Sequence, residues 1–282
     1  MEKIIFVLIV YFGRILLSQT PHEDLKYFTI ITNMMDSVKN IQSLRFNLKS
    51  LERIEKGYVE SIIKIKLQIN PRKVYLNNST AKLEVLYNVE KNKKTCLVNP
   101  HIFPHFNVSL DPTGKLMRKN QHFTMNQIGF DYVAKAIAMA LSKEKNNLTK
   151  HLKYMGKVEK NEMICHLFIY ENPAFSYEDY SVKENESIES VSQKLFVNEY
   201  MVRSRNKLFD EYNYLKKGTI LKIPTFYCKK GIFYISEKNM LPISITIFDD
   251  IGVFESYDFS NLEINTPIAP KEFEKNYKDY TF

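Results

Sequence analysis

Two histidines in the sequence have a spacing that suits metal binding. His101 and His105 are four residues apart, which on an α-helix would place both rings on one face. Pro100 and Pro104 stand directly before them, and proline breaks a helix interior because it lacks the backbone N–H. We therefore expect these histidines at a surface or in a turn, with no metal bound. His122 follows the polar stretch RKNQ and is also predicted to lie in a turn.

The acidic residues give weak signals for catalysis. Asp249 and Asp250 stand close to Gly252, a combination typical of turns. Glu255 lies on a predicted strand and could act as a general acid, but no neighbouring residue identifies a partner for it. The sequence contains no Gly-rich phosphate loop, no GxSxG, no HExxH and no catalytic cysteine motif. We therefore predict that the protein is not an enzyme and needs no cofactor.

The cysteines and the charge exclude further classes. Cys96, Cys165 and Cys228 are an odd number without a C-x-x-C pair, so neither a disulfide framework nor a zinc site is legible. One bridge plus a free thiol is the alternative to small apolar residues in strands. The net charge is +8, and residues 178–224 contribute nothing to it because they hold eight basic and eight acidic groups. A basic excess spread over the rest of the chain favours weak attraction to anionic surfaces and predicts no nucleic-acid partner.

The N-terminus has the layout of a secretory signal peptide. Lys3 precedes an apolar run from Ile4 to Phe12, and the small Ser18 precedes a polar stretch. From Ile4 to Leu17 the segment has fourteen residues, fewer than the roughly 20 that a spanning helix needs. We predict removal of residues 1–18 and export to the periplasm or cell envelope, with an uncleaved anchor as the alternative.

Apolar periodicity predicts an α+β fold. Apolar and polar residues alternate over 44–48, 63–69, 83–89, 163–169 and 243–247, as in antiparallel strands with one wet face. Amphipathic helices are predicted over 25–38 and within 124–143, where Thr124 and Gln127 have the capping-box spacing. We expect a curved antiparallel sheet, a half-barrel, capped by these helices.

One stretch, residues 180–224, follows a different pattern. A short alternating segment comes first, Ser187 and Asn198 are predicted N-caps of two helices, and Gly218 precedes a closing strand. This βααβ pattern resembles the LysM (lysin motif) module over its full length. The matching residues are Tyr180, Val182, Ser187, Ile188, Val191, Leu195, Asn206, Leu215, Gly218, Leu221, Ile223 and Pro224. We assign residues 178–224 to an inserted LysM-like module.

The resemblance to LysM implies a glycan partner. Such modules bind glycans that contain N-acetylglucosamine, so peptidoglycan is the implied partner. The implied contacts are Asn185, Glu186, Ser187, Asn206, Lys207 and Leu208. The sequence departs from the pattern in the first turn, where Asn185-Glu186 replace Gly-Asp, and after Asn206, where Lys207 replaces proline. A rigid spacer without affinity for sugar is the alternative.

The flanking residues, 19–177 and 225–282, carry a second resemblance. The phrases "LQINPRKVYL", "VNPHIFPHFNVSLDPTGKLMRKNQHFTMNQIGF" and "EFEKNYKDYTF" are similar to an uncharacterised family of exported bacterial proteins. That family looks allied in fold to the periplasmic outer-membrane lipoprotein carriers, in which an unclosed barrel with a helical lid encloses a cavity for acyl chains. A filled core is the alternative. The residues expected to face a lipid are Leu44, Phe46, Leu48, Ile63, Ile65, Leu67, Ile243, Ile245 and Ile247.

Together these patterns predict a non-enzymatic binding protein of the cell envelope. The LysM-like module would hold it at peptidoglycan, and the half-barrel would bind an acyl chain or a lipoprotein, with the basic excess favouring an anionic head group. Two alternatives stay open: a cell-wall hydrolase that the module targets, and a structural envelope protein without a small ligand.

Overall fold

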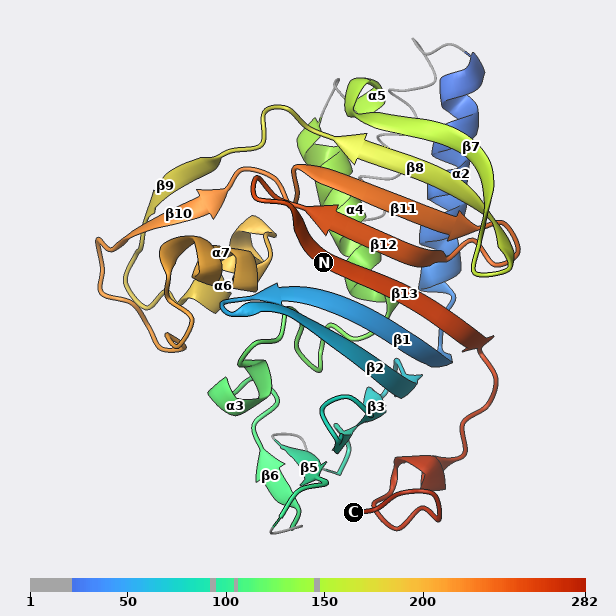
Figure 1. The fold of residues 1–282 in the computed structure, drawn as a ribbon, viewed down its shortest axis with the longest axis vertical. Coiled ribbons are helices and arrows are strands. Elements are labelled where there is room, and N and C mark those ends of the chain that lie inside the picture. The colour runs from blue at the N-terminus through green and yellow to red at the C-terminus, as the bar shows by residue number, and fades with distance from the viewer. Residues whose placement is uncertain (1–21, 92–94, 104–105, 145–147) are drawn as a thin grey trace.

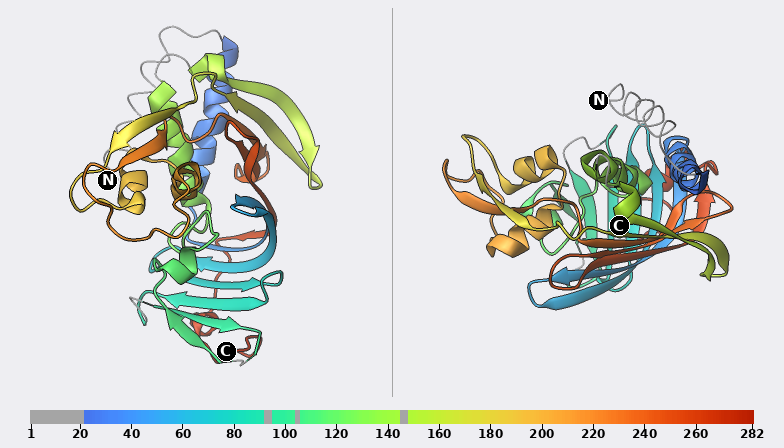
Figure 2. Two further views of the ribbon diagram at one scale, coloured as in Figure 1. Left: turned by 60° about the vertical axis from the view of Figure 1, so that its left-hand side comes forward. Right: turned by 90° about the horizontal axis from the view of Figure 1, so that it is seen from above.

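The fold is built on one large open sheet. The computed structural model describes residues 22–282 except 92–94, 104–105 and 145–147, so the predicted signal peptide lies outside the described residues. An antiparallel sheet of eleven strands curves around two helices, which cover the same face of it (Figures 1 and 2). The predicted α+β class with a curved antiparallel sheet and helices on one face is confirmed.

The eleven strands come from both ends of the sequence. Their order in the sheet is β6-β5-β4-β3-β2-β1-β13-β12-β11-β8-β7. Their bounds are β1 Ser43–Ile54, β2 Gly57–Gln68, β3 Lys73–Asn78, β4 Leu83–Asn88, β5 Cys96–Pro100, β6 Val108–Leu110, β7 Leu152–Lys160, β8 Met163–Glu171, β11 Lys230–Ser236, β12 Pro242–Phe248 and β13 Val253–Ile264. The five stretches of alternating residues lie on β1, β2, β4, β8 and β12, as predicted. Pairing of β1 with β13 joins the two halves of the chain in the middle of the sheet.

Two long helices cover the concave face. They are α2 (His22–Lys39) and α4 (Phe130–Glu144), and both were predicted from their apolar stripes. The start of α4 differs from the prediction. The amide N–H of Thr124 donates to the side chain of Gln127 at 2.8 Å, but these residues form a separate turn, and the helix begins only at Phe130, after Gly129 with φ +109°. No helix among the described residues is long and apolar enough to cross a membrane.

Shorter elements complete the sheet domain. Helix α3 (Lys115–Arg118) precedes the Thr124 turn, α5 (Leu148–His151) leads into β7, and a 3₁₀ turn, η2 (Pro270–Phe273), lies in the C-terminal segment. This segment packs on the convex face of β3 to β5. Tyr280 stacks on Tyr75 with ring centroids 3.7 Å apart, and the amide of Thr281 donates to the buried carboxylate of Glu84 at 3.0 Å.

Residues 177–224 form a smaller unit, which we call the insert. Strands β9 (Tyr177–Ser181) and β10 (Ile220–Pro224) pair with each other and enclose helices α6 (Ile188–Leu195) and α7 (Glu199–Asn206). The side chains of Ser187 and Asn198 accept amide hydrogen bonds at the starts of the two helices, as predicted for N-caps. The insert lies between β8 and β11, which are neighbours in the large sheet, and has its own small apolar core.

The insert is joined to the sheet domain through buried contacts. Tyr200 and Met201 of α7 belong to the large core rather than to the core of the insert. Arg118, only 6% exposed, donates to Glu189 at 2.9 Å and also pairs with Glu199. The insert therefore packs against the sheet domain and is not a separately tethered module.

Candidate functional site

A cavity of about 480 Å³ lies between the concave face of the sheet and the residues that cover it. This volume falls in the range of small-molecule sites, about 300–1,000 Å³. Strands from both halves of the sheet, α4, and the segment 116–129 that precedes α4 line the cavity. The interior is thus only partly filled, in contrast to the alternative of a filled core.

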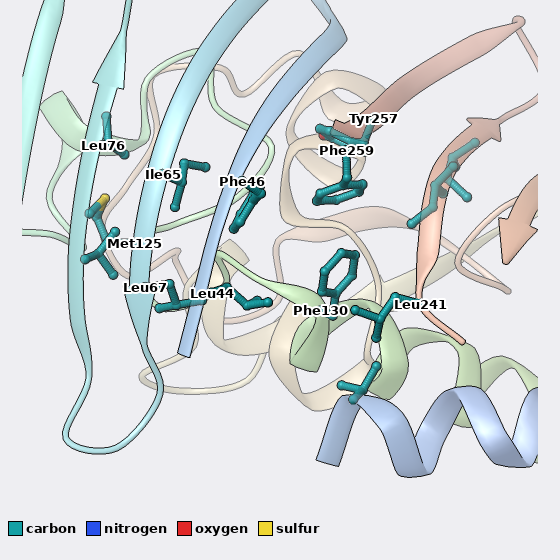
Figure 3. Close-up of a cluster of buried hydrophobic side chains, with 14 of the residues drawn as sticks. Leu44, Phe46, Ile65, Leu67, Leu76, Met125, Phe130, Leu241, Tyr257 and Phe259 are labelled. Atoms are coloured by element: carbon teal, nitrogen blue, oxygen red, sulfur yellow. The ribbon is translucent and has the colours of Figure 1, made fainter. Parts of the chain in front are cut away.

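Most of the cavity wall is apolar. Phe46 and Phe259 pack together at the middle of the sheet, with ring centroids 5.6 Å apart, and Ile65 and Leu76 extend this surface across β2 and β3 (Figure 3). Helix α4 faces them across the space. It contributes Tyr132, Val133, Ala136, Ile137 and Ala140. The two alanines are short, which leaves room between the helix and the sheet.

The lining changes from apolar to polar along the strands. On β1 the cavity-lining residues are Phe46, Leu48, Ser50 and Glu52 in that order. On β13 the partners of the last three are Phe259, Tyr257 and Glu255, so both strands change in the same direction. On β2, Ser61 stands opposite Ser50 and continues the polar row. We call the part of the cavity formed by Ser50, Glu52, Glu255 and Tyr257 the carboxylate end.

Hydrogen bonds hold the groups of the carboxylate end in place. Glu255, 1% exposed, is 2.8 Å from Nδ1 of His122 and accepts from Asn198 and Tyr227, each at 3.3 Å. The hydroxyl of Tyr257 also lies 3.3 Å from it. Glu52 accepts from the hydroxyl of Tyr257 at 2.6 Å and from the amide of His122 at 3.4 Å. Asn198 is the N-cap of α7, so the insert itself supplies one of these bonds.

The electrostatics of this cluster follow from its burial. Burial raises the pKa of Glu255, and the hydrogen bond and charge of His122 lower it by less. Burial lowers the pKa of His122, but the charge of Glu52 and the hydrogen bond and charge of Glu255 raise it by more, so the net shift is upward. Both ring nitrogens of His122 face acceptors, Nδ1 the carboxylate of Glu255 at 2.8 Å and Nε2 the carbonyl of Arg53 at 2.9 Å, an arrangement that suits a doubly protonated, cationic ring. The pKa of Tyr257 lies well above its usual value because the ring is buried beside these carboxylates, so its hydroxyl is a neutral donor.

The charged residues that line the cavity are both acidic. Glu52 and Glu255 face it, and no lysine, arginine or histidine of the described chain does. The ring of His122 lies outside the lining, between the rings of Tyr200 and Phe254 at centroid distances of 4.7 and 4.3 Å. The basic excess of the chain therefore lies elsewhere, and the expectation that it favours an anionic head group finds no support inside the cavity.

The residues predicted to face a lipid fall into two groups. Six of them, Phe46, Leu48, Ile63, Ile65, Ile245 and Ile247, line the cavity. Leu44, Leu67 and Ile243 are buried at 1% exposure or less but do not reach it. Leu67 instead packs close to Gly129, where a Cβ atom would lie 2.7 Å from its side chain. Whether the six residues contact a lipid stays a prediction.

The residues implied in glycan binding lie together in the insert, but several are occupied. Glu186 accepts from the hydroxyl of Tyr180, the amide of Lys183 and the ammonium of Lys194. The Asn206 amide donates to the carbonyls of Val202 and Lys222 and accepts from the amide of Lys222, and Ser187 caps α6.

The other implied glycan contacts are less committed. Asn185 and Lys207 have left-handed backbones with φ of 61° and 56°, and Leu208 packs against the core of the insert. The predicted contacts thus divide into side chains that build the turns and the exposed side chains of Asn185 and Lys207.

One pair of residues was missed in the sequence. His122 lies between α3 and the Thr124 turn, outside any helix or strand, but it is buried, and Glu255, for which no partner was identified, is paired with it. The pair is separated by 133 positions, so no local pattern reveals it. The signal that could have revealed the carboxylate end is the parallel change from apolar to acidic residues along 46–52 and 259–255. Asp249 and Asp250 do lie in the connection between β12 and β13, where Asp249 accepts the amides of Ile251 and Gly252.

The remaining chemical candidates are His101, His105 and the three cysteines. Among the residues that the structure describes, no group of three or more His, Cys, Asp or Glu side chains is placed to hold a metal ion. His101 lies after β5, where its Nε2 is 2.8 Å from the hydroxyl of Thr281, and His105 lies outside the described residues. Cys96, Cys165 and Cys228 are buried free thiols.

Comparison with solved structures finds distant likenesses. Lipoprotein LppX of Mycobacterium tuberculosis is 9% identical with a TM-score of 0.41, and the match covers 87% of this chain and 98% of that one. LprF of Mycobacterium bovis is 11% identical with a TM-score of 0.43, covering 86% and 93%. A LolA superfamily protein of Nitrosomonas europaea is 8% identical with a TM-score of 0.33, covering 88% and 97%. Likeness at this level does not extend to function.

Comparison with families gives a firmer result. None of the curated proteins matches the chain. Residues 41–219, from the second residue after α2 to the residue before β10, match the family described as "Protein of unknown function (DUF1571)". Because this match spans more than half of the chain, the protein belongs to the DUF1571 family.

Proposed function

We propose that this protein is an exported, non-enzymatic binding protein of the cell envelope, and that its cavity takes up the apolar chain of a lipid or of a lipid-modified protein. The observation that carries the proposal is a cavity of about 480 Å³ whose wall is apolar over most of its surface. Export rests on the predicted signal peptide, and N-terminal sequencing of the native protein should find a start near Gln19.

Burial of an alkyl chain supplies enough free energy for such binding. Each buried methylene contributes about 0.8 kcal/mol, so eight methylenes contribute about 6 kcal/mol before the cost of association is subtracted. The aromatic and β-branched side chains that line the sheet offer this contact without reorganising, because the sheet holds them in register.

A hydrolase is the competing function, and the pair Glu52 and Glu255 is the observation that favours it. Most glycosidases use two carboxyl groups that face each other across the scissile bond. Here Glu255 is enclosed by His122 and two further donors, Asn198 and Tyr227, and most of the remaining wall is apolar. The geometry therefore favours binding over hydrolysis.

The experiment is a binding titration with a neutral fluorescent probe that brightens in apolar surroundings. The mature protein should bind the probe at a saturable site, and lipids that co-purify with it should be identifiable by mass spectrometry. The test variant is Ile63→Glu, which places a charge in the cavity, and the matched control is Ile62→Glu on the opposite face of β2, where the side chain is 53% exposed. The first should abolish probe binding and the second should preserve it. A wild-type protein that binds no probe would refute the proposal.

We also propose that the insert binds a glycan containing N-acetylglucosamine, such as peptidoglycan. Its βααβ order and its capped helices support this, as do Asn185 and Lys207 at the two turns. Replacing both with glycine removes the side chains and keeps the left-handed backbone, since glycine adopts positive φ readily. The double variant should sediment less with insoluble peptidoglycan than the wild type does. If the wild type does not sediment, the insert acts as a rigid spacer.

A further inference from the structure

We infer that the polar end of the ligand carries a hydrogen-bond donor, a hydroxyl or an ammonium group, and that Glu52 receives it. This inference rests on the proposed binding of an apolar chain in the same cavity. It assigns the head-group chemistry from the groups that line the carboxylate end.

The register of the sheet orients the ligand. The rows that end in Glu52 and in Glu255 begin with Phe46 and Phe259, so an apolar chain lying along β1 and β13 has its favourable contacts at the phenylalanine end. The head of such a chain then lies beside the two carboxylates.

Glu52 has acceptor positions to spare and is less buried than Glu255. An ionised carboxylate offers about four acceptor positions. Glu255 is 1% exposed and uses three of them, on His122, Asn198 and Tyr227. The single proton of the Tyr257 hydroxyl goes to Glu52, the nearer acceptor at 2.6 Å. Glu52 accepts two hydrogen bonds. Its side chain is only partly buried and lines the cavity. A ligand hydroxyl or ammonium can therefore donate a hydrogen bond to a remaining acceptor position of Glu52.

The cations near this end are already engaged and cannot serve an anionic head group. His122 uses both ring nitrogens, Nδ1 on Glu255 at 2.8 Å and Nε2 on the carbonyl of Arg53 at 2.9 Å. The guanidinium of Arg53 is paired with Asp249 and donates to the carbonyl of Val253, outside the cavity lining. A phosphate or carboxylate placed here would meet Glu52 without a counter-charge.

The test compares three amphiphiles with the same twelve-carbon chain: dodecylamine, dodecanol and dodecanoate. Each displaces the neutral fluorescent probe from the mature protein near neutral pH, below the concentration at which it forms micelles. Repulsion between like charges a few Å apart in a partly buried site corresponds to a factor of about ten or more in affinity. We expect the amine and the alcohol to displace the probe at concentrations at least about tenfold lower than the acid.

Variants of Glu52 test whether this residue causes the preference among the three amphiphiles. Glu52→Gln should bring the three amphiphiles to similar affinities, and Glu52→Asp, which keeps the charge, should retain the preference. The control is Glu60→Gln on the outer face of β2, where the carboxylate is exposed and 4.0 Å from Lys49. If the acid displaces the probe as well as the amine does, or if Glu52→Gln leaves the preference unchanged, the head-group inference is wrong while chain binding stands. If no probe binds the wild type, both fail.

Discussion

Glu52 on β1 and Glu255 on β13 stand directly opposite each other in the sheet. Like charges at directly opposed positions destabilise a pair of strands. The pair is tolerated here because His122 enters between the strands and the insert, with its ring on Glu255 and its backbone amide on Glu52. The insert contributes Asn198 to the same cluster and stacks Tyr200 on the imidazole ring. An arrangement that costs stability is thus held by contacts from three distant parts of the chain.

The first prediction concerns His122. Replacing it with alanine leaves Glu255 buried without its main partner and opens a gap between Tyr200 and Phe254. Removal of one partner of a buried charged pair destabilises a protein by about 3–5 kcal/mol. We expect His122→Ala to lower the free energy of unfolding by this order, as measured by urea denaturation.

The double variant provides the control for this prediction. His122→Ala combined with Glu255→Gln removes the stranded charge and should recover part of the loss. A loss below about 1 kcal/mol for His122→Ala would show that the pair contributes no more than an exposed ion pair does.

How far the sequence predicts this structure depends on the distance over which each feature is determined. The alternation along 44–48 and 63–69 predicts β1 and β2 because the side-chain period of a strand is local. The N-caps Ser187 and Asn198 were predicted for the same reason, since a cap bonds amides two or three residues away.

Features that depend on tertiary contacts were not predictable in this way. The capping-box spacing of Thr124 and Gln127 produced a turn because the next residues, including Gly129, pass close to Leu67 before the helix begins. The pairing of β1 with β13 brings together residues about two hundred positions apart, and the site depends on that pairing. The burial of His122 was not predicted because its partners belong to β1, β13 and α7.

The second prediction concerns the pH dependence of the insert. The amide of Lys183, the ammonium of Lys194 and the hydroxyl of Tyr180 lower the pKa of Glu186 from 4.5 to about 2. Because the pKa is lower in the folded state, the stabilisation is fully present above about 4.5 and is lost as the pH falls toward 2. Glu186→Gln should therefore lower the Tm at neutral pH, and the difference from the wild type should shrink as the pH falls below about 4.5.

A direct measurement is available for the same residue. The carboxyl chemical shift of Glu186, followed by NMR during an acid titration of the folded protein, should report a midpoint near 2. A midpoint near 4.5, the ordinary value, would mean that the carboxylate is not held by these donors in solution.

The third prediction concerns the C-terminal segment on the convex face. Tyr280 stacks on Tyr75 at 3.7 Å and donates its hydroxyl to the carbonyl of Glu272 at 2.6 Å. Tyr280→Ala should cost about 1–3 kcal/mol in the free energy of unfolding. It should leave probe binding unchanged, because Tyr75 and Tyr280 are not among the residues that line the cavity. Asp279→Ala, at an exposed neighbouring position, is the control and should have little effect on either quantity.

The last prediction fills the cavity from the helix. Ala136 lies on α4, lines the cavity and faces the apolar part of the sheet. Ala136→Phe should place an aromatic ring in the space that the ligand chain occupies. Displacing three methylenes removes about 2 kcal/mol of binding free energy, roughly thirtyfold in Kd. The stability of the unliganded protein should stay the same or rise, because the ring occupies open space instead of displacing packed side chains.

Ala136→Ser, which is nearly the same size, is the control for the position and should bind as the wild type does. Probe affinity and urea denaturation of the same three proteins separate the outcomes. Unchanged affinity would place the ligand elsewhere, and a loss of stability above about 2 kcal/mol would indicate overpacking and so contradict an open cavity at this point.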